Sequence, residues 1–367
     1  MSSLSKNDLY NLRKKHLSSS QSLSYDTESF HPLNIVSGKG AYLIDEKGTK
    51  FLDTRNNVCH VGHQNEAVIK AVQTQVAKLN TNTRYLHENV VKLAEKLTKT
   101  MDGKLSKVFF VNSGSEANDL ALRLAFNFTK RRGVICLDSA YHGHTQTVIE
   151  ASPYKSKKTN CYSDLSKTRI LSRPIDAKKL DYYEEEMSDI LSDFSPACFI
   201  HESVISCGGA VLLPNGYVKS MYEKVRKAGG LCIADEVQVG FGRNGENYWF
   251  FQDHDVCPDI VTVGKPFGNG MPLAAVVTTE EVCKVFEQGP EYFNTYGGNP
   301  VCTAAGLAVM EEIERMELIK NASDVGGYLL ASFKDIMKYS VPGLEKNRFN
   351  FFQQLELFNF SSHIRYN

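Results

Sequence analysis

The spacing of apolar residues changes along the chain. Between residues 64 and 101, apolar side chains recur every three or four positions, as Val68, Val72, Val76 and Leu79 do. This spacing is typical of helices that bury one face. The sequence therefore predicts helical structure throughout this region.

From about residue 105, short apolar runs alternate with helical patterns. The run 108–111 precedes the segment 115–129, whose apolar residues follow a helical spacing. Further apolar runs lie at 133–137, 197–200, 231–234, 260–263 and 273–277. Helical stretches such as 217–228 separate several of them. Continuous apolar strands separated by helices are typical of a mostly parallel sheet covered on both faces, so we expect an α/β fold.

The regions on either side of this alternation carry other patterns. Residues 35–54 predict a small antiparallel piece with a turn signal at 46–48. Asn299 and Pro300 suit the N-cap and first position of a helix that we expect to reach about residue 315. The chain contains no internal repeat and no low-complexity linker.

Composition and charge exclude several classes of protein. Hydrophobic residues make up 42% and charged residues 23% of the chain, as in soluble globular proteins. Lys plus Arg equals Asp plus Glu at 42 each, which gives no bulk electrostatic reason to bind nucleic acid or an anionic membrane. No apolar run approaches the roughly 18 residues that a membrane span needs. The nine scattered cysteines form no CxxC pair, so we expect free thiols and no metal site.

The first twenty residues bear on the compartment. They combine serines with Lys6, Arg13, Lys14 and Lys15, and they lack the apolar core of a secretory signal. A mitochondrial transit segment has this composition, but an ordinary first helix is the favoured interpretation. We therefore expect a mitochondrial matrix or cytoplasmic protein that is neither secreted nor inserted in a membrane.

Three predicted strand ends carry polar residues of chemical interest. Gly114 and Ser115 lie in a turn before a strongly periodic helix, where free backbone N–H groups suit a phosphate. Asp235 and Lys265 each follow an apolar strand, at the end of the sheet where ligands bind in open α/β folds. A partly desolvated lysine there can act as a nucleophilic amine.

Taken singly, each of these features also has an ordinary interpretation as a capped turn, a loop carboxylate or a surface lysine. Their combination is more specific, because it supplies what pyridoxal 5'-phosphate (PLP) requires. The lysine forms a Schiff base with the aldehyde, the acid keeps the pyridine nitrogen protonated, and the helix N-terminus binds the phosphate. The residues thus predict a PLP site.

Five strings extend this prediction to a family resemblance. NSGSEAND, AYHGHT, IADEVQVGFGR, VGKPFGNGMP and FNTYGGNP are similar to motifs of the class III (PLP-dependent) aminotransferases, and the resemblance runs from about residue 8 to residue 342. It implies PLP fold type I. In that fold, a large domain with a mostly parallel seven-stranded sheet flanked by helices is joined by a small domain made of both chain ends.

The resemblance also implies a division of the chain. Residues 1–62 would be the N-terminal segment of the small domain, with short antiparallel strands, and 63–315 the large PLP-binding domain. Residues 316–342 would begin the C-terminal small domain, which the family continues beyond this point. Residues 343–367 fit nothing in the family. We interpret them as an atypical tail, in which the C-terminal domain is truncated or frame-shifted.

Carried over by position, the resemblance assigns the cofactor residues. Lys265 would be the Schiff-base lysine and Asp235 the partner of the pyridinium nitrogen. Gly114 and Ser115 would bind the phosphate through their N–H groups. Tyr141 would stack on one face of the ring.

Three further residues receive roles from the resemblance. Gln238 would contact the ring hydroxyl. Thr295 would reach the phosphate of the neighbouring subunit, so that a homodimer shares its active sites. Glu202 matches a family acid near the substrate amine, and with Lys265 and Asp235 it completes the predicted catalytic set.

One branch of the family resembles the chain in more detail. LRKKHL, NNVCHVGH, LNTNTRYLHEN, SPYK, ESVISCGG and GKPFGNG are similar to strings of the ethanolamine-phosphate and 5-phosphohydroxy-L-lysine phospho-lyases, which are alanine–glyoxylate aminotransferase 2-like. The branch implies release of phosphate and ammonia from a small phosphorylated amine. Asn57, His60, Arg84 and His87 are candidate donors to the leaving phosphate, although a structural role is favoured for each one alone.

Two other functions stay open at this point. A class III transaminase of the alanine–glyoxylate type shares the early chemistry and returns the proton to the cofactor. The atypical tail favours an inactive truncated form, which the intact set of cofactor residues opposes. In addition, residues 155–195 are shorter than in the phospho-lyase branch and lack its TYRG-like string, which bears on substrate contacts.

Overall fold

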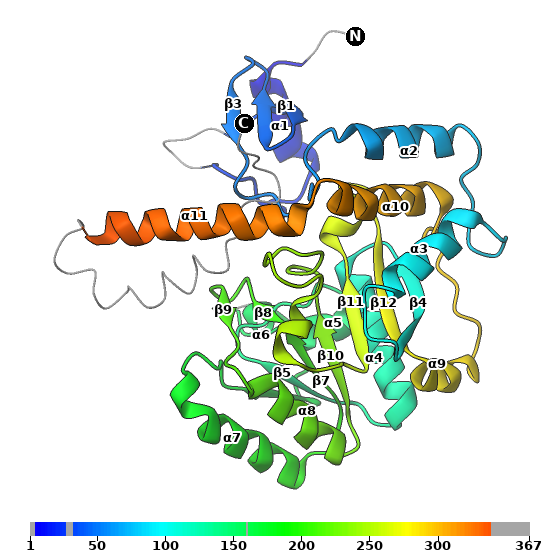
Figure 1. Cartoon of the computed structure of the whole chain (residues 1–367), viewed down its shortest axis with the longest axis vertical. Helices are drawn as coiled ribbons and strands as arrows, with labels where there is room; N and C mark the ends of the chain where they lie inside the picture. The colour runs from blue at the N-terminus through cyan, green and yellow to red at the C-terminus, as the bar shows by residue number, and fades with distance from the viewer. Residues whose placement is uncertain (1–3, 27–31, 159–160, 339–367) are drawn as a thin grey trace.

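A seven-stranded sheet forms the centre of the computed structural model, which describes residues 4–26, 32–158 and 161–338 (Figure 1). The strands follow the order β4 (Leu105–Val111), β12 (Ala274–Thr279), β11 (Ile260–Val263), β10 (Leu231–Asp235), β7 (Pro196–Glu202), β5 (Gly133–Leu137) and β6 (Thr168–Leu171). Within this sheet β12 alone is antiparallel to its neighbours, and the other strands share one direction. The predicted α/β fold with a mostly parallel sheet is therefore confirmed.

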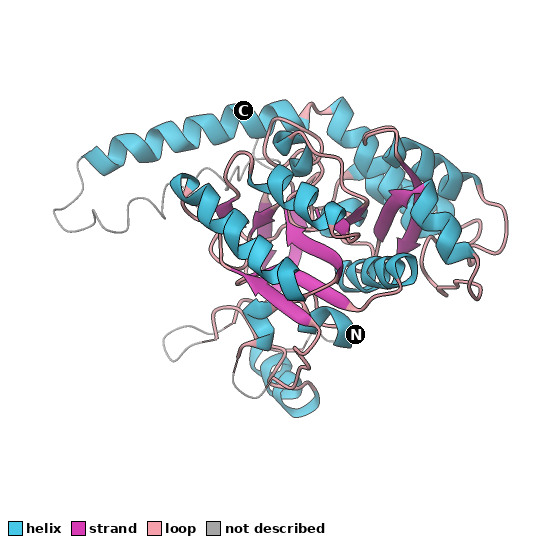
Figure 2. Cartoon of the chain, turned by 90° about the horizontal axis from the view of Figure 1, so that it is seen from below, coloured by secondary structure: helices cyan, strands magenta, loops and turns pink. Residues whose placement is uncertain are grey.

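Helices cover both faces of the sheet because its strands are apolar on both sides. Along β5, Val134 and Cys136 pack into one core and Ile135 into another, as the alternation of a strand requires. The first core lies under α4 (Gly114–Thr129), α5 (Gln146–Glu150) and α9 (Glu280–Glu287). The opposite face is covered by α7 (Leu180–Asp193), α8 (Tyr217–Lys227), α2 (Glu66–Val76), α3 (Glu88–Thr98) and α10 (Pro300–Arg315). Figure 2 shows helices on both sides of the strands.

The region 64–101 forms two helices rather than a continuous one. α2 ends at Val76, and α3 begins at Glu88 with His87 as its N-cap. The segment between them is rich in Asn and Thr, whose side chains compete with the helix backbone for hydrogen bonds. Leu79 lies in this segment with 49% of its surface exposed, so its predicted place on a buried helix face is wrong.

The antiparallel strands predicted in residues 35–54 are present. They are β1 (Ile35–Lys39), β2 (Tyr42–Asp45) and β3 (Lys50–Leu52), which form a separate three-stranded sheet. In Figure 1 this sheet lies at the top of the view, apart from the large sheet.

The remaining elements are short or lie near the chain ends. They are α1 (Lys6–His16), α6 (Pro153–Ser156), β8 (Val204–Ile205), β9 (Val211–Leu212), α11 (Leu318–Lys338) and the 3-10 turns Ala177–Lys179, Phe250–His254 and Lys265–Gly268. α11 extends away from the large sheet in Figure 1. None of the described helices is long and apolar enough to cross a membrane. The predicted tail, 343–367, lies outside the described residues, and the division into domains remains a prediction.

Candidate active site

The carboxyl ends of the parallel strands meet at one edge of the sheet, and the segments that leave them enclose a cavity of about 290 Å³. Ligands bind at this edge in open α/β sheets. The predicted site residues that line the cavity are Gly114, Ser115, Tyr141, Glu202, Asp235, Gln238 and Lys265. Residues that are up to 151 positions apart in the sequence are therefore brought together in one place.

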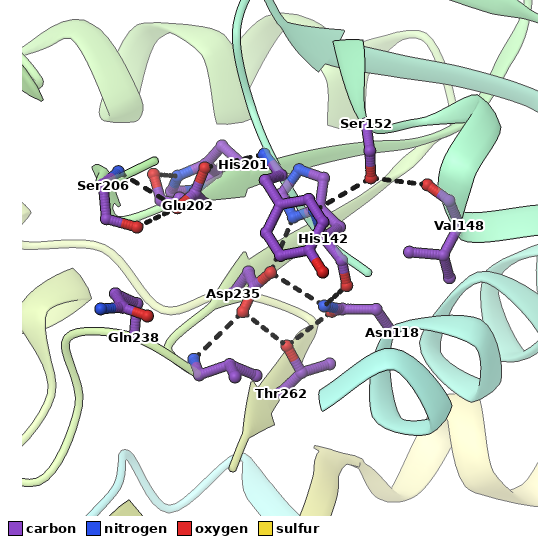
Figure 3. A network of polar contacts seen from close by, with 12 residues as sticks. Asn118, His142, Val148, Ser152, His201, Glu202, Ser206, Asp235, Gln238 and Thr262 are labelled. Atoms are coloured by element: carbon purple, nitrogen blue, oxygen red, sulfur yellow. Dashed lines mark hydrogen bonds and ion pairs between the residues drawn. The ribbon is translucent and has the colours of Figure 1, made fainter. Parts of the chain in front are cut away.

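Asp235 is a buried acid in this cavity, at the end of β10 and 3% exposed. Its Oδ2 accepts a hydrogen bond from Nδ2 of Asn118 at 2.8 Å and lies 2.7 Å from Nδ1 of His142 (Figure 3). Its Oδ1 accepts from the backbone N–H of Val237 at 3.0 Å. Hydrogen bonds of this kind favour a carboxylate's charged form, and a buried charge needs them. The arrangement suits an acid that pairs with a cationic ring nitrogen.

Lys265 follows β11 after one glycine and opens a 3-10 turn. Its φ of +29° is in a region that residues other than glycine rarely occupy, and such strain is often found at functional sites. Its Nζ donates a hydrogen bond to Oε1 of Gln238 at 2.6 Å. Gln238, which the family resemblance assigns to the ring hydroxyl, thus also orients the lysine amine in this structure.

The N-terminus of α4 forms one wall of the cavity, and its geometry suits a phosphate group. Ser113 is the N-cap and accepts from the N–H of Glu116 at 3.2 Å. The next N–H groups, at Gly114 and Ser115, have no acceptor within the helix. Gly143 packs against this turn with a φ of +143°, so closely that a Cβ there would lie 2.5 Å from Oγ of Ser115. Free N–H groups at a helix N-terminus attract phosphate, and this cradle therefore fits PLP.

Glu202 supplies a second buried carboxylate, on the strand next to Asp235 and in register with it. Its Oε1 accepts from the backbone N–H of Tyr141 at 2.9 Å, and its Oε2 accepts from Oγ of Ser206 at 2.7 Å. Burial raises the pKa of Glu202, and the charge of Asp235 also acts to raise it. A perturbed acid in a cleft is typical of functional sites.

The predicted residue Thr295 does not line this cavity. It is exposed on the loop between α9 and α10. An exposed position is compatible with contact to a neighbouring subunit, and that role remains a prediction.

The candidate phosphate donors near the N-terminal side of the site do not line the cavity either. His60 is buried, with Nε2 at 2.9 Å from a backbone carbonyl and Nδ1 at 3.2 Å from Nη2 of Arg243. Arg84 pairs with Glu291 at 3.2 Å on the surface. His87 caps α3. Within one chain, these contacts support the ordinary structural interpretation of His60 and His87.

Sequence reasoning missed two residues that contact the buried acid, Asn118 and His142. Both are inside the quoted strings NSGSEAND and AYHGHT, yet neither was assigned a role. Asn118 lies four residues after Gly114, and residues with this spacing share one face of a helix. That periodicity was a signal that Asn118 lies on the side of α4 that carries the phosphate cradle.

The fold and the cavity together define a PLP-dependent enzyme of fold type I. A family model described as aminotransferase class-III matches residues 24–345. The chain therefore belongs to the class III aminotransferase family, which confirms both the resemblance and PLP as cofactor.

Three similar proteins place the chain within this family. The alanine–glyoxylate aminotransferase 2-like protein of Drosophila melanogaster is 47% identical over 352 residues, which cover 89% of this chain and 69% of that protein. An Arabidopsis thaliana protein, mitochondrial alanine–glyoxylate aminotransferase 2 homolog 2, is 40% identical over 86% of this chain and 67% of its own length. The structure of a phospholyase from Arthrobacter in complex with phosphoethanolamine is 38% identical, with a TM-score of 0.84 over 91% of this chain and 80% of its own.

Proposed function

We propose that the protein is a PLP-dependent phospho-lyase that releases phosphate and ammonia from a small phosphorylated amine, ethanolamine phosphate or 5-phosphohydroxylysine. The observation that carries this proposal is the likeness to the Arthrobacter phospholyase bound to phosphoethanolamine, at 38% identity and a TM-score of 0.84. The strings that resemble the phospho-lyase branch support the same substrate class.

The chain's own residues suit the first chemical step. PLP, when bound, supplies the electron sink for loss of a proton beside the amine. The amine of Lys265 is in the cavity beside Gln238 and takes that proton. Asp235 holds the charge on the ring nitrogen, the α4 cradle holds the cofactor phosphate, and Tyr141 packs against the ring.

The overall reaction is balanced without an oxidant or reductant. The C–H bond beside the amine and the C–O bond to the phosphate break, and the electron pair of the C–O bond leaves with the phosphate. Water then hydrolyses the remaining unsaturated amine to an aldehyde and ammonia. Fixed donors stabilise the charge of a leaving phosphate. The buried acid Glu202 lies close enough to the cavity to contact the substrate ammonium group.

We propose that two copies of the chain complete each other's sites. Thr295 and Arg84 lie on neighbouring loops, since Arg84 is 4.0 Å from the ring centroid of Phe293. The same surface exposes Leu86 fully and Tyr85 to 68%. Large exposed apolar patches mark interaction sites, so a second copy covering this surface would bring both polar residues to its cavity.

A transaminase of the alanine–glyoxylate type is the second candidate. The observation that favours it is the 40% identity to the Arabidopsis thaliana protein of that name. Both reactions need Lys265 and Asp235, so the cofactor site does not separate them. The two reactions differ in the step that follows loss of the proton. In a transaminase the proton returns to the cofactor, whereas in a phospho-lyase the phosphate leaves the substrate.

The test is to incubate the full chain with PLP and each candidate substrate. Phosphoethanolamine or 5-phosphohydroxylysine should release phosphate and ammonia in equal amounts with no keto acid present. Alanine with glyoxylate should give no pyruvate. The Lys265→Ala variant is the control, because phosphate release that survives it comes from a contaminating phosphatase. Pyruvate formation without phosphate release would overturn the proposal in favour of the transaminase.

For the compartment, the name of the Arabidopsis thaliana relative includes mitochondrial. We propose the mitochondrial matrix or the cytoplasm for this chain. Fractionation of cells that express the tagged full chain tests this directly.

A further inference from the structure

Asp235 contacts buried polar side chains that also form hydrogen bonds with one another (Figure 3). The proposed role of Asp235 at the ring nitrogen does not by itself account for these contacts. Asn118 is 1% exposed, and each polar group of its side chain has a partner. Its Nδ2 donates to Oδ2 of Asp235 and to the carbonyl oxygen of His142, both at 2.8 Å. Its Oδ1 accepts from Oγ1 of Thr262 at 2.7 Å.

These contacts determine the orientation of the Asn118 side-chain amide, that is, which terminal atom is the oxygen and which is the nitrogen. With oxygen and nitrogen exchanged, the amide oxygen would face a carboxylate oxygen and a carbonyl oxygen, both of which are acceptors. Two contacts between acceptors in a buried place are costly. The amide therefore donates to Asp235, and its orientation follows from the surrounding hydrogen bonds.

His142 contacts the same carboxylate oxygen from another side. Its side chain has no exposed surface, and Nδ1 lies 2.7 Å from Oδ2 of Asp235. Among the described residues, Nε2 has no hydrogen-bond partner. Because a carboxylate oxygen is an acceptor, Nδ1 of His142 is assigned as the donor of its hydrogen bond to Asp235.

The backbone holds His142 in this position. Its N–H donates to Oγ of Ser152 at 3.0 Å, and that hydroxyl donates to the carbonyl oxygen of Val148 at 2.7 Å. Other titratable groups at this end of the cavity are Glu202, in register on β7, and Lys265 after β11. The two side chains that contact Oδ2 of Asp235 thus come from α4 and from the loop after β5, two elements distant in sequence from β10.

We propose that Asn118 and His142 are positioning residues that together hold the carboxylate of Asp235 directed at the cofactor ring nitrogen. The inference rests on the proposed role of Asp235. Asn118 is on the same helix as the phosphate cradle, one turn beyond Gly114, so α4 links the two ends of the cofactor site.

Asn118→Asp is the sharpest variant, because it preserves shape and replaces the donor with an acceptor beside Asp235. The two carboxyl groups must then share a proton, which draws the negative charge of Asp235 partly away from the ring nitrogen. His142→Leu removes one donor, and His142→Asn supplies an amide N–H in its place. Tyr222→Phe is the control, since it removes a buried hydrogen bond to His201, 2.9 Å long, outside the cavity.

The readouts are the PLP dissociation constant and the protonation of the ring nitrogen, observed by NMR of cofactor labelled with the heavy nitrogen isotope. Hydrogen bonds to charged groups are worth enough that Asn118→Asp and His142→Leu should weaken PLP binding roughly 10-fold or more. Their ring nitrogen resonance should move toward the unprotonated form. His142→Asn should restore both properties in part, and Tyr222→Phe should change neither. A thermal melt establishes that each variant is folded.

Asp235→Asn, measured in parallel, separates this inference from the proposed function. A change of ring protonation in Asp235→Asn but not in Asn118→Asp or His142→Leu would show that the two residues merely fill space, which overturns the inference alone. An unchanged ring in Asp235→Asn would overturn the proposed role of Asp235, and the inference with it. Equal loss of PLP in the Tyr222→Phe control would also contradict a specific role.

Discussion

Two regions of the molecule differ in whether their side chains have partners within the chain. One is the floor of the cavity, around Asp235, and the other is the surface formed by the loops 77–87 and 289–298. At the floor, Asp235 is 3% exposed and accepts hydrogen bonds on both carboxylate oxygens. On the loop surface, Leu86 is fully exposed and Tyr296 is 69% exposed. All the proposed cofactor residues except Thr295 thus line one cavity within a single chain, whereas the loop surface has apolar side chains that nothing in the described chain covers.

This difference separates what one chain supplies alone from what we propose that a second copy supplies. Lys265 and Asp235, which both candidate reactions need, line the cavity. Thr295, the proposed contact to the cofactor phosphate of a neighbouring subunit, and Arg84, a candidate donor to the leaving phosphate, are on the exposed loop surface.

The largest effect is expected at the floor, from Lys265→Ala. This change removes the amine that we propose to bind the cofactor covalently and to move the proton, so turnover should fall by roughly 10³-fold or more while the fold is kept. Phosphate release by the variant measures the loss. Borohydride reduction and peptide mapping of the unmodified protein should label Lys265. A label on another lysine would contradict the assignment.

Asp235→Asn should have the next largest effect. The amide cannot balance a charge on the ring nitrogen, and loss of one oriented electrostatic group typically lowers kcat by about 10²-fold. Some PLP should remain bound, because the α4 cradle is unchanged. Turnover and bound PLP are measured on the same preparation. Turnover close to that of the unmodified protein would show that Asp235 has another role.

The loop surface is tested by Leu86→Asp, with a smaller expected effect. A charge in the centre of an apolar interface should weaken association by roughly 30-fold or more. Sedimentation should show more monomer, and activity should fall with dilution. Tyr182→Asp is the matched control, because Tyr182 is 53% exposed on α7, away from this surface. If Leu86→Asp leaves mass and activity unchanged, the shared-site proposal fails.

The smallest expected effect is on how the stability of the fold varies with pH. It concerns Glu236, the buried residue that follows Asp235 in the sequence. Burial raises the pKa of Glu236 to about 7, above its ordinary value of 4.5. The folded protein then holds a proton that the unfolded chain releases, so this contribution to stability is complete below 4.5 and is lost as pH rises through about 7. Glu236→Gln cannot titrate, and its unfolding free energy should vary less with pH over that window. Denaturant unfolding of both proteins at several pH values measures the difference, with exposed Glu185→Gln as a control that keeps the original slope.

The sequence predicted the fold and the main residues of the cavity because their signals are local. Asp235 and Lys265 follow strands that are apolar throughout, and the phosphate turn is followed by a clearly periodic helix. Each signal needs only a few neighbouring residues. The packing of the strands then brings their ends to one edge.

The contacts that hold Asp235 could not be predicted in this way. Asn118 and Asp235 are separated by 117 residues, and His142 and Asp235 by 93. An Asn on a helix has no pattern that identifies its partner. The interruption between α2 and α3 was missed for a related reason, since the apolar spacing continues into a segment whose Asn and Thr residues end the helix.

The position of β12 in the sheet determines when during protein synthesis the cofactor can first be captured. β12 lies between β4, which leads into the phosphate cradle, and β11, which leads to Lys265. A ribosome that has just added Lys265 has already made Gly114, Asp235 and the lysine itself, but not the strand that joins their supports. Pairing β4 with β12 also closes the long loop 112–273, a slow step in folding. We therefore expect that nascent chains arrested before Ala274 bind no PLP, and that the cofactor is captured late on the ribosome or after release.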